Sequence, residues 1–341
     1  MTADIDVLVT GGAGFIGSHL VDALLERPST TVTVLDRLST GGSRANLEAH
    51  GGDPRLRFVQ GDVADAALVD DLVSGSGAVI HAAAESHVDR SIDEPASFLR
   101  SNVIGTQSVL DAVAAHSVRM VMLSTDEVYG PGEAGDDVFD EDHPLRPTSP
   151  YAASKAAADL LCGAYVSTYG APVVIVRGTN AFGPRQIERV VPTFAICALE
   201  GRPVPVYADG RQRREFLHVT DWVAAALRVL DAGEPGAVYN IGGGHELENL
   251  ELARRICELA GAPESQIAHV PDRPGHDFRY GLRADRLRAL GWTPEVSFDD
   301  GLSRVVEWYR EHLVWLRGAH QVPVTTEPRP AGAGRAGEER P

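Results

Sequence analysis

The sequence has few basic residues for its length. Its 31 Lys and Arg residues face 48 Asp and Glu residues, which gives a formal net charge of −17 at pH 7. A protein of this charge repels nucleic acid and anionic membrane surfaces, so neither is predicted as a partner. An anionic small-molecule substrate would therefore need a local cluster of arginines.

Cysteines and long apolar runs are also scarce. Cys162, Cys197 and Cys257 have no metal-ligand spacing and cannot all pair. Each falls in a predicted helix, so we expect reduced, buried thiols, no metal site and a cytoplasmic protein. The N-terminus has no basic segment followed by an apolar one, so no signal peptide is predicted. No apolar run is long enough to span a bilayer.

Apolar strand-like and helix-like segments alternate through the first half of the 341-residue chain. Near-continuous apolar strands between helices predict an α/β fold, a Rossmann-type doubly wound parallel sheet. The predicted strands are 5–10, 32–36, 56–60, 78–81, 119–123 and 173–176, and the main predicted helices are 15–25, 96–115 and 151–168.

Beyond about residue 178 the pattern is irregular and rich in arginine. We expect residues 1–178, with returning segments at about 215–243, to form the Rossmann-type domain. Residues 179–315 would mainly form a smaller, partly interleaved α/β substrate domain. The Pro-, Gly- and Ala-rich residues 318–341 are predicted to be disordered. Further strands are predicted at 204–207 and 237–241, and further helices at 191–199, 220–230, 250–260 and 298–311.

A glycine-rich turn joins the first predicted strand to the first helix. Gly12, Gly14 and Gly17 fit G-x-G-x-x-G, and Gly11 adds a second spacing, G-x-x-G-x-x-G. Such glycines allow a tight turn and close backbone approach to a pyrophosphate at the helix N-terminus. The strand–turn–helix context favours dinucleotide binding over a purely structural turn.

Acidic residues end the next two predicted strands. Asp36 lies 19 residues after Gly17 and would bind a ribose diol, which favours NAD over NADP. Arg37 weakens that preference slightly. Asp62 and Val63 lie where an adenine would bind, and a helix cap is an equal alternative for Asp62.

A tyrosine and a lysine lie on one face of the helix predicted at 151–168. Tyr151 and Lys155 are four residues apart. An ammonium lowers the pKa of a nearby phenol, so we expect Lys155 to lower the pKa of Tyr151 toward neutral pH. Tyr151 could then take the proton of a substrate hydroxyl. Lys155 would also bind the nicotinamide ribose. Thr125 or Ser124, at the end of the fifth strand, is placed to share the substrate hydroxyl.

Two adjacent carboxylates follow Thr125. In a regular strand Asp126 and Glu127 would face opposite sides, so both reach one substrate only if the chain curls there. Neighbouring carboxyl groups divide acid and base roles when their environments separate the two pKa values. The alternative is that both pair with arginines or cap a loop.

Together these motifs resemble the extended short-chain dehydrogenase/reductase family, up to about residue 315. Within it, Thr125-Asp126-Glu127-Val128-Tyr129-Gly130 is similar to the signature of nucleotide-sugar 4,6-dehydratases, above all those acting on dTDP-glucose. Other similar runs are Ala84-Glu85-Ser86-His87-Val88-Asp89-Arg90-Ser91, Tyr239-Asn240-Ile241-Gly242-Gly243 and Asp272-Arg273-Pro274-Gly275-His276-Asp277.

The resemblance implies a hydro-lyase with tightly bound NAD. Oxidation at C4 of the hexose acidifies the C5 proton, the C6 hydroxyl leaves as water, and hydride returns to C6. The expected product from dTDP-glucose is dTDP-4-keto-6-deoxyglucose. Glu127 is the candidate base at C5, and Asp126 is the candidate acid at C6, which requires a raised pKa. Thr125, Tyr151 and Lys155 complete the predicted catalytic set.

The resemblance also implies two sets of binding residues. Arg214 and Arg273 would bind the diphosphate bidentately, whereas Arg211 and Arg213 are expected to make solvated ion pairs. For His87 a structural role is an equal alternative. The predicted cofactor residues are Gly11, Gly14, Phe15, Ile16, Gly17, Asp36, Asp62, Val63, Ala82, Tyr151 and Lys155. The predicted substrate residues are Ser86, His87, Asn180, Arg189, Pro205, Tyr207, Arg214, Asn249 and Arg273.

The loop at 177–189 departs from the pattern. Enzymes acting on dTDP-glucose usually have two consecutive asparagines and a tyrosine before Gly-Pro, then an aromatic residue and a histidine. Here Ala181 and Phe182 replace the second asparagine and the tyrosine, and Arg185-Gln186 follows in a loop one residue shorter. The departure leaves the nucleotide base and the sugar open.

Two alternatives and an oligomeric state follow. The altered loop keeps open a UDP-sugar 4-epimerase or 5,6-dehydratase. A non-catalytic NAD-binding regulator is a third reading, which the intact Tyr151, Lys155, Asp126 and Glu127 disfavour. Helices 96–115 and 150–169 resemble the pair that forms a four-helix dimer interface in the family, so a homodimer is predicted.

Overall fold

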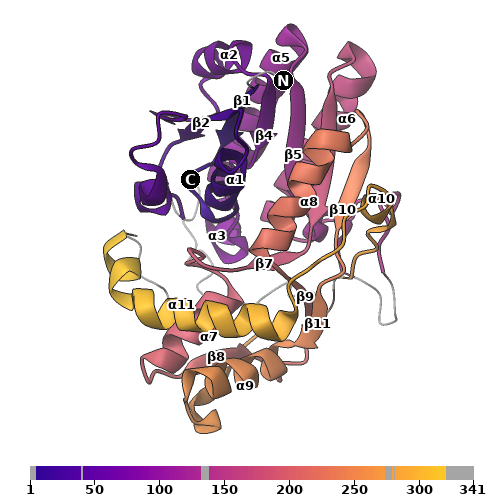
Figure 1. Cartoon of the computed structure of the whole chain (residues 1–341). Coiled ribbons are helices and arrows are strands. Elements are labelled where there is room, and N and C mark those ends of the chain that lie inside the picture. The colour runs from indigo at the N-terminus through magenta and orange to yellow at the C-terminus, as the bar shows by residue number, and fades with distance from the viewer. Residues whose placement is uncertain (1–4, 40, 132–137, 273–278, 280, 320–341) are drawn as a thin grey trace, which may run out of the picture.

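The computed structural model describes residues 5–39, 41–131, 138–272, 279 and 281–319. Its centre is a seven-stranded parallel sheet in the order β10-β6-β5-β4-β1-β2-β3 (Figure 1). The predicted Rossmann-type α/β fold is confirmed. The strands are β1 (Ile5–Thr10), β2 (Thr30–Asp36), β3 (Leu56–Gln60), β4 (Ala78–His81), β5 (Arg119–Thr125), β6 (Val173–Gly178) and β10 (Val238–Ile241).

Helices cover both faces of this sheet. The core on one face lies beneath α1 (Phe15–Leu25) and α8 (Val219–Ala232), which stand in front of the sheet in Figure 1. The core on the other face lies beneath α2 (Ala66–Ser74), α5 (Gly105–His116) and α6 (Pro150–Tyr169). Burial on both faces explains why the strands read as continuous apolar runs.

Helix α6 begins and ends as its sequence predicts. The Ser149 side chain caps the first turn by accepting a hydrogen bond from the Ala152 N–H (3.1 Å), and Pro150 occupies the first helical position. Gly170 ends the helix in the left-handed conformation, with φ of 67°.

The single helix predicted over 96–115 is wrong in detail. The chain forms α3 (Val88–Asp93), α4 (Pro95–Phe98), the π-helix η2 (Leu99–Ile104) and then α5. In the widened turn Asn102 exchanges two hydrogen bonds with the backbone of Glu85, at 2.8 and 2.9 Å. These side-chain bonds, which local periodicity does not encode, accompany the change in helical geometry.

A smaller unit follows β6. One of its sheets has the order β11-β9-β7, and the other pairs β8 with β12. Its elements are β7 (Asn180–Phe182), α7 (Val190–Leu199), β8 (Val204–Tyr207), β9 (Arg213–His218), β11 (His245–Glu248), α9 (Asn249–Ala260), η4 (Glu264–Gln266), β12 (Ile267–Val270) and α11 (Phe298–Ala319), and α10 (Asp285–Ala289) lies near β10. We keep the boundary at residues 178/179 as a proposal.

The C-terminal helix corrects one prediction. α11 runs to Ala319, so Gly318 and Ala319 belong to a helix and not to the predicted disordered tail. The rest of that prediction, residues 320–341, lies outside the described residues. The three cysteines are free and buried, as predicted. In the described part of the chain, no helix is long and apolar enough to cross a membrane. The described residues also contain no group of three or more His, Cys, Asp or Glu side chains that could hold a metal ion.

Candidate functional site

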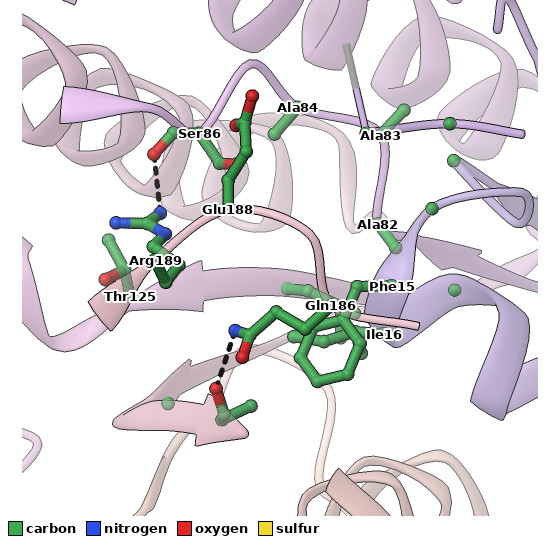
Figure 2. A pocket seen from close by; sticks show the side chains of 18 of the residues that line it. Phe15, Ile16, Ala82, Ala83, Ala84, Ser86, Thr125, Gln186, Glu188 and Arg189 are labelled. Carbon is green, nitrogen blue, oxygen red and sulfur yellow. Dashed lines mark hydrogen bonds between the residues drawn. The ribbon is translucent and has the colours of Figure 1, made fainter. Parts of the chain in front are cut away.

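A cleft at the carboxyl ends of the central strands is lined by both halves of the chain (Figure 2). Its walls come from the glycine turn, the segment after β4, the end of β5, the start of α6 and the loop after β7. The predicted residues on its wall are Gly11, Gly14, Phe15, Ile16, Gly17, Asp36, Val63, Ala82, Ser86, Thr125, Asp126, Glu127, Tyr151, Lys155, Asn180 and Arg189.

The glycine turn is too tight for side chains. A Cβ on Gly17 would lie 2.1 Å from the Gly11 carbonyl oxygen, and Gly11 has a φ of +70°. Gly14, the N-cap of α1, has no side chain to cap the helix, and the first turn of α1 carries no acidic residue. The N–H groups and positive dipole end of α1 are therefore available to a phosphate. This part of the chain fits a dinucleotide.

Asp36 is fixed at the end of β2. Its Oδ2 accepts a hydrogen bond from the Ala13 N–H (3.0 Å), and its Oδ1 accepts one from the Leu38 N–H (2.8 Å). Burial raises the pKa of Asp36, and these backbone bonds oppose the shift. The carboxyl group stays next to the glycine turn, where a ribose diol would lie.

Arg37, next to Asp36, pairs with Glu85, a residue to which the sequence analysis gave no role. Arg37 Nη2 donates a hydrogen bond to Oε1 of the buried Glu85, and Arg37 Nη1 lies 3.5 Å from Asp62 Oδ2. Glu85 also pairs with Arg90. Because Arg37 is held between two carboxylates, it no longer weakens the argument for NAD over NADP.

The alternative role of Asp62 as a helix cap is wrong. The N-cap of α2 is Asp65, whose side chain accepts a hydrogen bond from the Leu68 N–H at 3.2 Å. Asp62 Oδ1 instead accepts one from the Ala64 N–H at 2.9 Å. Asp62 is not on the cleft wall, although Val63 is.

The chain curls where β5 ends. Thr125 is the last residue of β5 and the N-cap of η3 (Asp126–Tyr129), a single turn of 3-10 helix. Its Oγ1 accepts a hydrogen bond from the Glu127 N–H (3.3 Å) and donates one to Asp126 Oδ1 (3.1 Å). This curl, which both carboxylates require to face one ligand, brings Asp126 and Glu127 to the same cleft.

Asp126 has the environment of a proton donor. It is 3% exposed, and its Oδ2 has no hydrogen-bond partner among the described residues. Burial, and then the neighbouring Glu127, raise the pKa of Asp126 to about 7. A carboxyl group with such a pKa holds a proton at neutral pH in a substantial fraction of molecules.

The pKa of Tyr151 differs from the prediction. Burial and the charge of Glu127 raise the pKa of Tyr151, which Arg189 lowers in part. Lys155 donates a hydrogen bond to the Leu123 carbonyl oxygen at 2.6 Å, and burial lowers its own pKa to about 8. The expected lowering of the Tyr151 pKa is therefore wrong in this structure, because burial outweighs the opposing effects of Arg189 and Thr125.

Arg189 reaches across the cleft. Its Nη2 donates a hydrogen bond to the Ser86 carbonyl oxygen at 2.5 Å (Figure 2), and its Nη1 lies 3.9 Å from Glu127 Oε1. Its guanidinium carbon lies 5.9 Å from the centre of the Tyr151 ring. Arg189 has a φ of 109°, which is strained for a residue with a side chain.

The divergent loop forms part of the wall. Arg185 pairs with Asp22 of α1 and donates a hydrogen bond to the Asn46 carbonyl oxygen (2.9 Å). Gln186 donates one to the Ala181 carbonyl oxygen (3.0 Å), as Figure 2 shows. Gln186, Ile187 and Glu188 line the cleft, although the sequence analysis assigned them no role. In the sequence, the departure of this loop from the family pattern was the signal that could have pointed to these residues.

Several predicted substrate residues lie away from the cleft wall. His87 caps α3 by accepting a hydrogen bond from the Arg90 N–H at 3.3 Å, which supports its structural alternative. Arg214 is buried and lowers the pKa of Asp126. Pro205 and Tyr207 belong to β8, Asn249 begins α9, and Arg273 lies outside the described residues.

Two neighbouring arginines make the ion pairs expected of them. Arg211 lies 3.5 Å from Asp209, and Arg213 lies 3.2 Å from Glu246, with partly exposed side chains. The Asn249 Oδ1 atom, by contrast, is buried without a hydrogen-bond partner in the part of the chain that the structure describes.

Comparison with known proteins gives one family and close relatives. Residues 7–242 match the model of the NAD dependent epimerase/dehydratase family. A dTDP-glucose 4,6-dehydratase from Streptomyces niveus is 50% identical over 317 residues, covering 91% of this chain and 94% of that protein.

Solved structures of members of this family have the same fold as this chain. A dTDP-glucose 4,6-dehydratase from Streptomyces venezuelae, determined with NAD bound, superposes with a TM-score of 0.88 at 47% identity, covering 91% of this chain and 98% of that one. A UDP-glucose 4-epimerase from Thermus thermophilus with NAD gives a TM-score of 0.82 at 34% identity, covering 90% and 99%.

Substitution of Gly17 by alanine tests the dinucleotide turn. The new Cβ would lie 2.1 Å from the Gly11 carbonyl oxygen, so the turn must shift. We expect Gly17→Ala to weaken dinucleotide binding by about tenfold or more, measured as nucleotide retained by the purified protein. Gly52→Ala is the control, because no described atom lies within 4 Å of its Cβ position. Equal retention by the two variants would contradict the assignment.

Substitution of Asp126 by asparagine tests its burial. Because the pKa of Asp126 is raised from 3.8 to about 7 in the folded state, the stability linked to its bound proton is full below pH 3.8 and is lost as the pH rises through about 7. Urea unfolding should therefore show a smaller loss of stability between about pH 5 and pH 8 in Asp126→Asn than in the wild type. The exposed Asp71→Asn is the control. Identical pH slopes would refute the shift.

Proposed function

This chain belongs to the NAD-dependent epimerase/dehydratase family, and we propose that it converts dTDP-glucose to dTDP-4-keto-6-deoxyglucose by removing water. The observation that carries the proposal is the turn Thr125–Asp126–Glu127 on the same cleft wall as Tyr151 and Lys155. A dehydratase needs an acid and a base in addition to the oxidation machinery, and this cleft has candidates for both.

The cleft has groups for holding NAD and the C4 hydroxyl. The turn Gly11–Gly17 would bind the pyrophosphate, Asp36 the adenosine ribose, and Lys155 the nicotinamide ribose. NAD held by these residues would supply the hydride acceptor for oxidation at C4 and the hydride for reduction at C6. Thr125 would bind the C4 hydroxyl, and Tyr151 would take its proton. Because the pKa of Tyr151 is raised in this structure, Arg189 is the charge that favours the phenolate.

Elimination would use the two carboxyl groups in opposite senses. Once C4 is a ketone, Glu127 takes the C5 proton, and the electrons of that C–H bond form the C5–C6 double bond. The C6–O bond breaks as Asp126 donates its proton, so the hydroxyl leaves as water. After hydride reaches C6, a proton returns to C5. The raised pKa of Asp126 and the weaker burial of Glu127 suit these separate roles.

Sugar-nucleotide binding would use Ser86, Asn180 and Arg189 on the cleft wall. The buried Arg214, and Arg273 outside the described residues, are proposed for the diphosphate, while Tyr207 and Asn249 are proposed for the nucleoside. The buried Asn249 Oδ1, which has no hydrogen-bond partner among the described residues, supports such a contact, because a buried acceptor usually finds a donor.

The divergent loop is the reason to keep a second candidate. Gln186 and Glu188 face the cleft, so a UDP-sugar could be bound there in place of a dTDP-sugar. A 4-epimerase, however, has no step that needs a protonated carboxyl group such as Asp126. The two dehydratases named above are 50% and 47% identical to this chain, whereas the epimerase is 34% identical.

We also propose a homodimer formed by the outer face of the helices α5 and α6. The two helices pack side by side, and apolar side chains are exposed on and beside them. Leu160 is 66% exposed and Tyr169 64%, and Leu99 and Ile104 of the adjoining η2 are about half exposed. Exposed apolar side chains on neighbouring helices are typical of an interface.

A panel of nucleotide sugars tests the reaction and the base together. With dTDP-, UDP-, CDP- and GDP-glucose, mass analysis should find a product lighter by one water from the dTDP-sugar, without net NADH. Tyr151→Phe should lower kcat by a factor of about 10²–10⁴, because the base is lost. Recovery of a C4 epimer without loss of water would overturn the dehydratase assignment.

Light scattering after gel filtration tests the dimer. The wild type should have twice the mass of the 36.4 kDa chain. Leu160→Glu should be monomeric, because it places a charge in the proposed interface. Val314→Glu, at an 84% exposed position on α11, is the control and should remain dimeric. A dimeric Leu160→Glu protein would place the interface elsewhere.

A further inference from the structure

We propose that Tyr129 and Arg177 are positioning residues for the elimination step, because they fix the turn that carries Asp126 and Glu127. The inference rests on the proposed function. It concerns a buried network that lies behind the cleft and that the steps above do not use.

The turn η3 is short enough for its two ends to move together. It has four residues, with Asp126 at its start and Tyr129 at its end. A 3-10 turn rises about 2 Å per residue, so a displaced Tyr129 would displace the carboxyl groups. After Tyr129 the chain passes Gly130, where a Cβ would lie 2.1 Å from the Arg146 carbonyl oxygen. Close packing thus holds the backbone just beyond the turn.

The Tyr129 hydroxyl is held from two sides. It donates a hydrogen bond to Asn240 Oδ1 (2.7 Å) and accepts one from Arg177 Nη1 (3.0 Å). The side chain is 1% exposed, and the Arg177 guanidinium carbon lies 5.0 Å from its ring centre. Phenylalanine would fill nearly the same volume, so the hydroxyl serves to fix position more than to fill space.

Arg177 connects this turn to the helix that carries Tyr151. Its Nε donates a hydrogen bond to Asp159 Oδ2 at 2.8 Å, and both side chains are nearly inaccessible. Asp159 lies on α6, four residues after Lys155. The network therefore gives the acid–base turn and the helix of the oxidation machinery a common anchor.

The oxidation groups also have supports outside this network. Thr125 is held by β5, whose register pairs it with Gly178 of β6. Tyr151 is held by α6 and by a hydrogen bond from its N–H to Ser91 Oγ (3.1 Å). Loss of the Tyr129 hydroxyl should therefore disturb Asp126 and Glu127 and leave the oxidation at C4 intact.

Tyr129→Phe tests the proposal during turnover of dTDP-glucose. If elimination alone is slowed, C4 oxidation continues and enzyme-bound NADH accumulates, which its absorbance reports. We expect kcat to fall by about tenfold or more and KM to change by less than about twofold. Arg177→Lys, which keeps the charge near Asp159 but loses the guanidinium fork, should show the same accumulation.

Tyr239→Phe is the matched control. Tyr239 is also buried, and its hydroxyl accepts a hydrogen bond from the Glu234 N–H at 3.1 Å, on a strand that carries no proposed catalytic group. It should match the wild type in kcat and bound NADH. Thermal unfolding identifies any variant that fails to fold, and the other network variant then decides the outcome.

Two results would overturn the inference. One is wild-type kcat in folded Tyr129→Phe and Arg177→Lys. The other is a lower kcat without extra bound NADH, which would mean that oxidation is slowed as well and that the network is merely structural. Failure of the proposed function looks different, because the wild-type protein itself would then release no dehydrated sugar.

Discussion

Parallel strand pairing is the constraint on which the rest of the structure depends. It brings the carboxyl ends of β1, β2, β4, β5 and β6 to one edge of the sheet. The glycine turn, Asp36, Ser86 and Thr125 meet there although long stretches of sequence separate them. The register matters as much as the order, because a slip of one residue would turn Thr125 to the opposite face of the sheet.

Burial then sets the protonation of the groups that this edge collects. It raises the pKa of Asp126 to about 7 and lowers that of Lys155 to about 8, so both groups titrate near neutral pH. It also raises the pKa of Tyr151. Desolvation favours the neutral form of each group, whatever its charge type. The same low-dielectric site thus prepares an acid for donating its proton and makes the phenol harder to ionise.

Local patterns predicted the parts of the site that follow local rules. The glycine turn, Asp36 and the pair Tyr151/Lys155 were found from spacing, and the strands from apolar runs. The curl after Thr125 was predicted as the condition for both carboxylates to face one ligand. In the structure the Thr125 hydroxyl accepts a hydrogen bond from the Glu127 N–H at this curl. Other features depend on contacts between distant segments, which spacing does not encode: the pairing of Glu85 with Arg37, the π-helix and the raised pKa of Tyr151.

The divergent loop has a consequence for how long a cofactor stays. Arg185 ties one end of the segment 185–189 to Asp22 and Asn46, and Arg189 ties the other to Ser86. The residues between them form part of the cleft wall. Both ends of the segment therefore hold the second half of the chain against the first half, which carries the glycine turn. Since each turnover regenerates NAD, such contacts across the cleft favour a cofactor that stays bound while the sugar nucleotide is exchanged.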